Sequence, residues 1–528
     1  MAGLIFAQNR ATFSRGAGLL PCNPMLPKAQ TSWTREEAAH LLNRAGFGGA
    51  PNSINDLHAM GREKAVDFLL QPTEAPDAFA EPDWCQPAKV AEEARRRFQL
   101  IRENRIAARD MTPEEADRKR REIQQSFQRD ERRRGMEAQG WWLDRMLKSQ
   151  APLREKMTFF WHDHFATSAQ KVREPILLLR QNQLFRAHAL GNFKKLTHKI
   201  TQDGAMMLYL DLQNSKKGKP NENFAREVME LFTLGQGNYT EEDIRQAARA
   251  FTGYSINRLS GEVTFNKKQW DETEKNFLGA KGNFDADGIV DIIFQQEQTS
   301  RYVPTKLWEF FAYEEPPTTA VDDLAKTFRD SKFEVSSVLR EIFLSKEFYS
   351  EKCMHAQIKS PIHFFVQMLK QLEIPEIPSA YALYVQAQLG QILYAPPNVA
   401  GWDWGKAWIN TNTLLTRYQI SGHLCKAGST QAPEKNMSKV KGFAMPKGGM
   451  NASSAGPNYD VLVPRDARDN VEKIVDSLID RLFQRPLSGN VRESFIAYGN
   501  EKKGVIFTNQ EVAELIHLMM STPHYQLT

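Results

Sequence analysis

The sequence has 528 residues, of which 41% are hydrophobic and 25% are charged, and it carries a formal net charge of +5. This composition is typical of a soluble globular protein. No stretch approaches the roughly 18 apolar residues that a membrane-spanning helix needs. The first 30 residues also lack the longer apolar region of a secretory signal. We therefore expect either a cytoplasmic protein or a chain that, as given, lacks its export signal.

The first predicted helix follows an N-terminal extension over residues 1–33, which begins with a short apolar stretch and predicts little structure. Thr34 and Glu37 then form a capping box, in which the hydroxyl and the carboxylate each satisfy a backbone amide at a helix start. Apolar residues recur at helical spacing after it, and Gly46 ends the run. The sequence therefore predicts a helix that begins just after Thr34.

Helical periodicity continues through most of the chain and predicts one main helical domain over residues 34–425. Within it we predict a basic helical arm over residues 86–135, with a new helix starting near Pro113. The stretch over residues 254–283 is different, because apolar residues alternate there with polar ones between glycines. That pattern predicts a small hairpin or a long ordered loop.

The last part of the chain begins with a change in composition. Residues 426–469 are rich in Gly, Ser, Pro, Lys and Asn, which predicts a flexible loop. Residues 470–528 are expected to form a helical pair that packs back on the main domain. Signals for strands are too few for a large sheet. The predicted fold class is therefore all-α, a large multi-helix domain with a small hairpin or ordered-loop insertion.

Positive charge is concentrated in the arm. Between Arg95 and Arg134 there are 14 Lys and Arg against 8 Asp and Glu, a surplus of six, which exceeds the net charge of the whole chain. Such a segment can attract an acidic partner. Its acidic residues are dispersed, however, and its aromatic residues are only Phe98 and Phe127. That pattern is more typical of a solvated helical arm and argues against nucleic acid as the partner.

Several chemistries have no support in the sequence. There is no P-loop, no G-x-G-x-x-G after a strand, no G-x-S-x-G and no H-E-x-x-H. The four cysteines lie far apart without a C-x-x-C pair, which argues against a zinc ribbon; they are Cys22, Cys85, Cys353 and Cys425. Nucleotide-dependent and serine-hydrolase activities are therefore not indicated. The sequence identifies no cofactor, and it leaves open whether a metal is bound.

The segment from Pro220 to Gly235 (PNENFAREVMELFTLG) places more polar groups at the start of a helix than folding requires. Asn221 can cap this helix, and Glu222 then lies near the positive end of the helix dipole. Both are candidate substrate-binding residues. Glu227 and Glu230 lie three residues apart, which suits acid–base chemistry or metal ligation from one helix face.

Arg226 gives the same segment a structural alternative. It lies between Glu222 and Glu230 at a spacing of four residues to each, where ion pairs stabilise the surface of a helix. Spacing alone favours this salt-bridged surface. In an enzyme, by contrast, Arg226 would neutralise a substrate anion beside the catalytic carboxylates.

His162, Asp163 and His164 form a second polar cluster inside an aromatic segment. On a helix the two histidines point to nearly opposite sides, so they cannot both bind one ion. His164 continues an apolar stripe and is predicted to be buried, where a histidine more often bonds to a backbone carbonyl than to a metal. His162 and Asp163 are predicted to be exposed. We hypothesise that this helix end faces the carboxylates of Glu227 and Glu230.

Three tryptophans, Trp402, Trp404 and Trp408, lie in a turn-rich segment between Pro396 and Asn410. Loops of this kind can stack sugar rings or other flat apolar faces, because a tryptophan ring offers a large area at low entropic cost. The segment fits equally well a loop that fills a gap between helices. Both interpretations stay open.

Together these clusters resemble the bacterial domain-of-unknown-function 1800 family, over about residues 34–528. The segments that carry the resemblance are Ala38–Phe47, Arg154–Ser168, Asn221–Gly235, Tyr239–Gly253, Lys306–Trp308, Pro397–Ile409 and Met519–Leu527. The resemblance implies an α-helical fold and, commonly, export to the periplasm or the cell exterior. Members are often encoded beside a second, sulfatase-like family (domain of unknown function 1501), which is the partner implied. It implies no established reaction.

This chain departs from many relatives at two positions. Many relatives have a His-Asp pair where this chain has Trp270-Asp271, and some have a histidine where it has Phe232. A metal site that used those histidines would be incomplete in this chain.

Three functions follow from these observations. The first is an exported or envelope-associated enzyme acting on a polymeric or anionic glycan, with His162 or His164 and Glu227 as acid and base and the tryptophans stacking the substrate. The second is a non-catalytic helical scaffold or partner of an exported sulfatase-like protein, and the third is a metal-dependent hydrolase. An enzyme requires the histidine and Glu227 to converge on an open cleft. A scaffold would instead bury these groups as paired networks.

Overall fold

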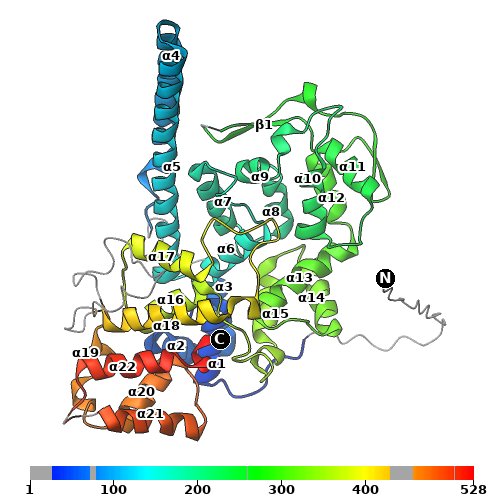
Figure 1. Cartoon of the computed structure of the whole chain (residues 1–528). Helices are drawn as coiled ribbons and strands as arrows, with labels where there is room; N and C mark the ends of the chain where they lie inside the picture. The colour runs from blue at the N-terminus through cyan, green and yellow to red at the C-terminus, as the bar shows by residue number, and fades with distance from the viewer. Residues whose placement is uncertain (1–25, 72–78, 259, 428–455, 503, 505) are drawn as a thin grey trace, which may run out of the picture.

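Helices make up 65% of the computed structural model, which has 22 α-helices and two small antiparallel hairpins among the residues that it describes. The predicted all-α fold class with a small hairpin insertion is therefore confirmed. The described residues are all of 1–528 except 1–25, 72–78, 259, 428–455, 503 and 505. Figure 1 shows a body of short helices, from which one long helical hairpin projects at one end.

The predicted start of the first helix is confirmed. The hydroxyl of Thr34 accepts a hydrogen bond from the Glu37 amide, and the Glu37 carboxylate accepts one from the Thr34 amide. The first helix is buried on almost every side, so it lies inside the body rather than on its surface. The three N-terminal helices are α1 (Arg35–Ala45), α2 (Pro51–Met60) and α3 (Arg62–Leu70).

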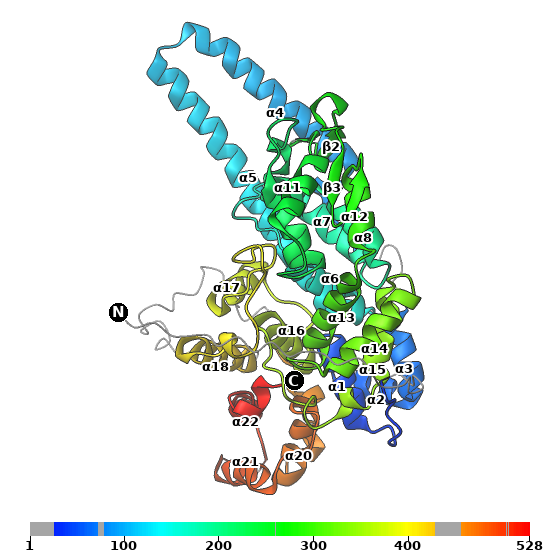
Figure 2. The ribbon, with the colours of Figure 1, turned by 90° about the vertical axis from the view of Figure 1, so that its right-hand side faces the viewer.

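The segment predicted to be a basic helical arm forms the projecting hairpin of Figures 1 and 2. It consists of α4 (Pro87–Ala107) and α5 (Pro113–Lys148). Thr112 and Glu115 form a second capping box at the predicted break, so this helix start is also confirmed.

The two helices of the arm are held together by buried charge. Arg97 is only 8% exposed, and its guanidinium donates to Glu93 at 2.6 Å and to Glu131 on the opposite helix at 2.7 Å. The second helix continues past the predicted end of the arm, because its last turns carry apolar residues that pack in the core. Trp142 there is completely buried.

The body next to the arm is built from short helices and carries most of the predicted site residues. They are α6 (Pro152–His164), α7 (Pro175–Ala187), α8 (Phe193–Ile200), α9 (Gly204–Tyr209), α10 (Glu222–Glu227), α11 (Glu241–Ala250) and α12 (Ala286–Ile293). A π-helix, η4 (Val228–Thr233), continues α10 directly. Short π-helical turns occur often at functional sites, and nothing in the sequence predicted this one.

The predicted hairpin or ordered loop over residues 254–283 is confirmed as two hairpins. The strands are β1 (Tyr254–Asn257), β2 (Glu262–Phe265), β3 (Lys275–Phe277) and β4 (Ala280–Gly282). In the first hairpin Tyr254 lies opposite Phe265. The turn of the second has positive φ at both Leu278 and Gly279, 46° and 82°, as a type I′ turn requires.

The rest of the body consists of six further helices. They are α13 (Glu297–Phe311), α14 (Thr318–Asp330), α15 (Val335–Leu344), α16 (Pro361–Gln371), α17 (Ser379–Leu389) and α18 (Thr411–Lys426). Almost every residue of α16 is buried, so it forms a second central helix, and its Gln367 donates to the side chain of Asn43 on α1 at 3.1 Å.

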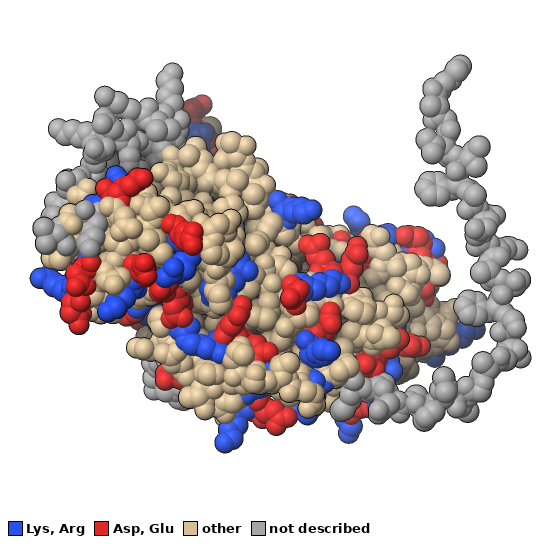
Figure 3. Space-filling model, turned by 90° about the horizontal axis from the view of Figure 1, so that it is seen from below, with Lys and Arg blue, Asp and Glu red and all other residues tan. Residues whose placement is uncertain are grey.

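Residues 470–528 contain one helix more than the predicted pair. The three helices are α20 (Val471–Leu482), α21 (Gly489–Lys502) and α22 (Asn509–Met520), and the short helix α19 (Tyr459–Leu462) precedes them within the segment predicted to be a loop. The additional helix, α21, lacks a clear apolar stripe, since only Phe495 and Gly499 are buried in it. His517 on α22 donates from Nε2 to the Tyr418 carbonyl at 2.9 Å, which ties this part to α18. Seen from below, the molecule shows acidic and basic side chains interspersed (Figure 3).

Three remaining expectations concern membrane spans, cysteines and the irregular segments. No described helix is both long and apolar enough to cross a membrane. The described cysteines, Cys85, Cys353 and Cys425, are buried and unpaired. Most of the predicted N-terminal extension (1–33) and of the predicted flexible loop (426–469) falls outside the described residues, so these two assignments stay predictions.

Candidate functional site

His162 lies in the aromatic core, not at the surface where we predicted it. It is 1% exposed, and its ring lies 5.2 Å from that of Trp142 and 5.6 Å from those of Tyr394 and Trp402. The prediction was wrong because the second helix of the arm and the tryptophan segment cover the face opposite the apolar stripe. Burial lowers the pKa of His162 to about 3, so its imidazole is neutral at ordinary pH.

Asp163 is also buried, contrary to the prediction. It is 7% exposed, and its Oδ1 accepts a hydrogen bond from the backbone amide of Trp402 at 2.7 Å. Gly401 packs directly against the same carboxylate, with φ at +89°. Burial raises the pKa of Asp163 to about 7, against the hydrogen bond, which lowers it. The carboxylate therefore holds the tryptophan segment against the end of α6.

His164 lies on the apolar stripe of α6, but it is only partly buried and not fully buried as predicted. Its ring stacks on Phe160 at 5.8 Å, and its Nε2 donates a hydrogen bond to the carbonyl of Phe232 at 3.0 Å. Burial lowers its pKa to about 3, so the donor is the neutral imidazole. The end of α6 therefore contacts the segment that carries Glu227 and Glu230, at the backbone of Phe232. The histidine, however, bonds to the backbone of the π-helix and not to a carboxylate.

The start of α10 is capped as the sequence predicted. Oδ1 of Asn221 accepts from the Asn223 amide at 3.0 Å, and its Nδ2 donates to the carbonyl of Asp211 at 3.3 Å. Glu222 lies in the first turn and is partly buried. Asn221 thus has a structural task that by itself explains its place at this position.

The structural alternative required Arg226 to pair with Glu222 and Glu230, and it pairs with neither of them. Its two terminal nitrogens donate to the two carboxylate oxygens of Glu241, each at 2.8 Å, and this hydrogen-bonded pair raises the pKa of Arg226. Glu241 begins the next helix, fifteen residues later, so the pair ties α11 to α10. Helical spacing within one segment could not reveal that partner.

Glu227 and Glu230 differ in their surroundings. Glu230 accepts from Gln236 at 2.7 Å and from the Tyr239 hydroxyl at 2.8 Å, and these two bonds lower its pKa. Glu227 is partly buried, and burial together with the charge of Glu230 raises its pKa. Of the two predicted catalytic carboxyl groups, only that of Glu227 has a raised pKa, as a general acid requires.

The part of the chain that the structure describes contains no set of side chains that could bind a metal ion. There, no three side chains of His, Cys, Asp and Glu gather closely enough to hold an ion. At the two positions where the resemblance implies a histidine in many or some relatives, this chain has aromatic rings of other kinds. Phe232 is buried with its ring 6.0 Å from that of His164, and Trp270 donates from Nε1 to the Ala250 carbonyl at 3.3 Å.

The three tryptophans do not form one stacking surface. Trp402 and Trp408 are 5% and 8% exposed, and Trp402 itself stacks on Phe159 at 5.7 Å. Only Trp404 is open to solvent, at 48%, with its ring edge-on to Phe310. Two of the three rings therefore fill the core, which is the other interpretation that the sequence left open.

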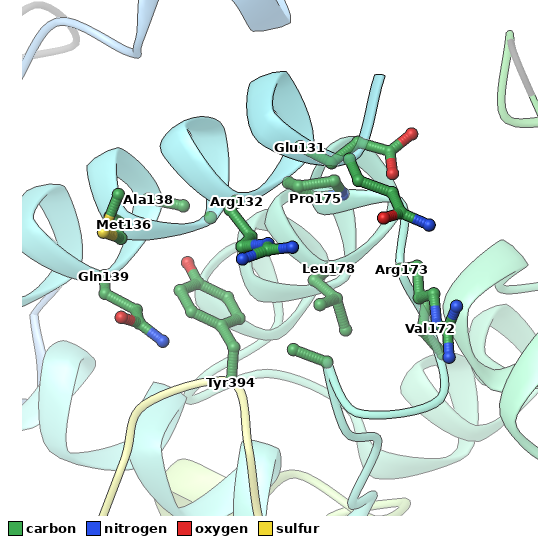
Figure 4. A pocket seen from close by; sticks show the side chains of 13 residues that line it. Glu131, Arg132, Met136, Ala138, Gln139, Val172, Arg173, Pro175, Leu178 and Tyr394 are labelled. Carbon is green, nitrogen blue, oxygen red and sulfur yellow. The ribbon is translucent and has the colours of Figure 1, made fainter. Parts of the chain in front are cut away.

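A pocket that the sequence did not reveal lies at the base of the arm, with a volume of about 480 Å³. Figure 4 shows Arg132 on α5, Arg173 just before α7, and Tyr394 from the chain after α17 around it. Tyr394 also contacts His162, so the pocket wall and the buried cluster are adjacent. The arginine-rich arm was visible in the sequence, but its closeness to residue 173 and to Tyr394 depends on tertiary structure.

Comparison with known proteins supports the resemblance seen in the sequence. A family model described as "Protein of unknown function (DUF1800)" matches residues 40–527. The chain belongs to this family. Neither a curated protein nor a solved structure matches it significantly. The family therefore establishes kinship along nearly the whole chain, and its description assigns no reaction, substrate or partner.

Proposed function

We propose that this protein is a non-catalytic helical scaffold that binds an acidic partner protein through the outer face of its arm. The placement of the predicted catalytic groups supports the first half of this proposal. His162 and His164 are neutral and packed among aromatic rings. Arg226 and Glu230 are engaged with other side chains. These groups join segments of the fold, as buried networks in a scaffold do.

The observation that carries the second half is a mixed basic and apolar face on α4, which we call the arm strip. At 100° per residue, six side chains fall on one side of this helix; they are Arg95, Phe98, Ile101, Arg102, Arg105 and Ile106. Phe98, Ile101 and Ile106 are 65%, 51% and 52% exposed. The acidic residues of α4 lie on its other faces.

The charge of the arm strip is uncompensated. Within the described part of the chain, Arg95, Arg102 and Arg105 form neither an ion pair nor a hydrogen bond through their guanidinium groups. By contrast, Arg96 and Arg97 on the opposite side are paired with Glu93. The strip therefore offers free guanidinium groups, which match carboxylates in two-point contacts, beside three apolar side chains.

This combination fits a protein partner better than a glycan or a membrane. Arginine and large apolar side chains dominate the contacts that contribute most to protein interfaces. A glycan is usually stacked on exposed aromatic rings, and the strip has only Phe98. Three apolar side chains also bury little area for membrane anchoring. The sulfatase-like protein that family members are often encoded beside is the first partner to test. From the same resemblance we propose a periplasmic or extracellular location.

The test is a binding titration of the full chain with that sulfatase-like protein at two salt concentrations. The double substitution Arg102→Glu with Arg105→Glu should weaken binding at least about tenfold. The matched control, Arg118→Glu with Lys119→Glu, reverses two exposed charges on α5, the other helix of the arm, and should leave binding unchanged. Added salt should weaken wild-type binding, because the contacts are between exposed charges.

Two outcomes would contradict this proposal. One is equal binding by both double variants. The other is binding to a polyuronate or to anionic vesicles that depends on the strip, with no binding to the protein partner, since the occupant would then belong to another class.

One observation favours the enzyme as a second candidate. The pKa of Glu227 is raised by burial, and within the described residues no hydrogen bond engages its carboxyl group. If the protein were a glycan hydrolase, Glu227→Gln would abolish hydrolysis of an anionic polysaccharide without changing the melting temperature. On the scaffold proposal neither the wild type nor this variant releases reducing ends.

A further inference from the structure

The pocket at the base of the arm has apolar walls and a basic rim. Val172 and Leu178 are 0% and 5% exposed and form part of its apolar wall, together with Pro175 at the start of α7. Arg132 and Arg173 reach it from two different segments, as Figure 4 shows. The volume of about 480 Å³ lies within the range of small-molecule sites.

The rim is positive because the nearby acids are engaged elsewhere. Glu131 also lines the pocket, but its carboxylate accepts from Arg97 at 2.7 Å. Glu174 pairs with Arg258 at 3.3 Å. Arg132 and Arg173 have neither an ion pair nor a hydrogen bond among the described residues. Both guanidinium groups are therefore free to bind an oxyanion.

Tyr394 provides an independent sign that this wall is more than packing. Its ring is 3% exposed, and its buried hydroxyl has no hydrogen-bond partner in the described structure. Its backbone has φ at +63°, a region that a bulky side chain rarely adopts. An unsatisfied hydroxyl and a strained backbone both cost stability, and such costs gather at binding sites.

We propose that this pocket binds a small organic anion, whose carboxylate or phosphate lies between Arg132 and Arg173 and whose apolar body rests on Pro175 and Leu178. The site is separate from the arm strip, so it does not depend on the proposed partner protein. The apolar wall distinguishes it from a site for inorganic phosphate. The two free guanidinium groups distinguish it from a site for neutral apolar ligands.

The experiment is calorimetric titration of the full chain with 1-naphthyl phosphate, compared with 1-naphthol and with inorganic phosphate. We expect one saturable site per chain for the naphthyl phosphate, and binding at least about tenfold weaker for each of the other two probes. The Arg132→Gln, Arg173→Gln double variant should weaken naphthyl phosphate binding at least about tenfold. Arg129→Gln is the control, because Arg129 is an exposed arginine of the same helix outside the pocket.

Both arginines are exposed, so the double variant is expected to melt at the wild-type temperature. The proposal is overturned if naphthyl phosphate shows no saturable binding, or if the double variant binds it as tightly as Arg129→Gln does. It is also overturned if 1-naphthol binds as tightly as the phosphate ester, because the arginines would then contribute nothing.

Discussion

The carboxylate of Asp163 accepts a hydrogen bond from the backbone amide of Trp402 at 2.7 Å, across 239 residues of sequence. This bond fixes the tryptophan segment to the end of α6. From the same helix end, His164 bonds to the carbonyl of Phe232 in the π-helix. Three segments that carry the family resemblance therefore meet at one turn of helix, and each contact joins parts of the fold.

Gly401 packs against Asp163, so a side chain at position 401 should clash with it. This clash can be separated from the cost of placing a side chain at a positive φ. In Gly401→Ala the new Cβ would overlap the Asp163 carboxylate and lie 2.8 Å from its carbonyl oxygen, at φ +89°. Gly390→Ala is the matched control, since Gly390 has φ +82° and nothing within 4 Å. We expect the control to lose about 1–2 kcal/mol of unfolding free energy from the backbone alone. Gly401→Ala should lose at least about 2 kcal/mol more, because the packing must also move.

Urea unfolding of both variants measures this difference. Equal losses would mean that the tryptophan segment does not pack against Asp163 as described.

The raised pKa of Asp163 predicts a pH-dependent effect on stability. The pKa rises from 3.8 in the unfolded chain to about 7 in the fold. Because the fold favours the protonated carboxyl, the wild-type protein is most stable, with respect to this group, below pH 3.8. That stability is lost as pH rises through about 7 and the buried group becomes charged. Asp163→Asn keeps an acceptor for the Trp402 amide without the charge. Relative to the wild type, it should therefore gain stability progressively between about pH 4 and pH 7, by up to about 4 kcal/mol.

The measurement is the unfolding free energy of both proteins across that range, since other titrating groups cancel in the difference. A difference in unfolding free energy that stays constant with pH would show that the pKa of Asp163 is unchanged by folding. A difference that narrows as pH rises would show that folding lowers this pKa, and either result would contradict the prediction.

Glu155 forms the centre of a buried ion cluster at the base of the arm. It is 0% exposed and accepts from Arg145 at 3.1 Å and from Arg186 at 2.6 and 2.9 Å. Burial raises its pKa, but Arg186 and Arg145 outweigh this and lower it. Glu155→Gln removes the carboxylate that Arg145 and Arg186 share and leaves the buried guanidinium group of Arg186 without a counter-charge. It should cost about 3–5 kcal/mol of unfolding free energy.

Glu137→Gln, in the exposed pair with Arg133 at 2.7 Å, is the control and should cost less than about 1 kcal/mol. If the two substitutions cost the same in denaturant unfolding, the cluster does not hold the arm to the body.

Local signals predicted helix starts well. The hydroxyl and carboxyl groups of the capping boxes at Thr34 and Thr112 act within four residues, so the sequence contains the whole interaction. We did not predict α21, because it lacks an apolar stripe. Its stability comes from packing against neighbouring elements, and a local pattern does not show that packing.

The site was less predictable, because its contacts are distant in sequence. His162 lies on the polar side of α6 by spacing, yet α5 and the tryptophan segment cover it. Arg226 found its carboxylate on the next helix. The position of Tyr394 beside Arg132 and Arg173 follows from the fold and from an unusual backbone angle, and neither can be predicted from a tyrosine in a sequence.

The most direct test measures, for two variants, both the unfolding free energy and the binding of the sulfatase-like protein. One variant should lose stability and keep binding, and the other should lose binding and keep stability. His164→Leu leaves the Phe232 carbonyl unpaired and should lower the unfolding free energy by about 1–3 kcal/mol, while the folded variant binds the partner as the wild type does. The Arg102→Glu, Arg105→Glu variant should unfold like the wild type and lose binding at least about tenfold. The reverse pattern, with binding lost in folded His164→Leu and retained in the arm variant, would place the working surface at the motif cluster and contradict the account.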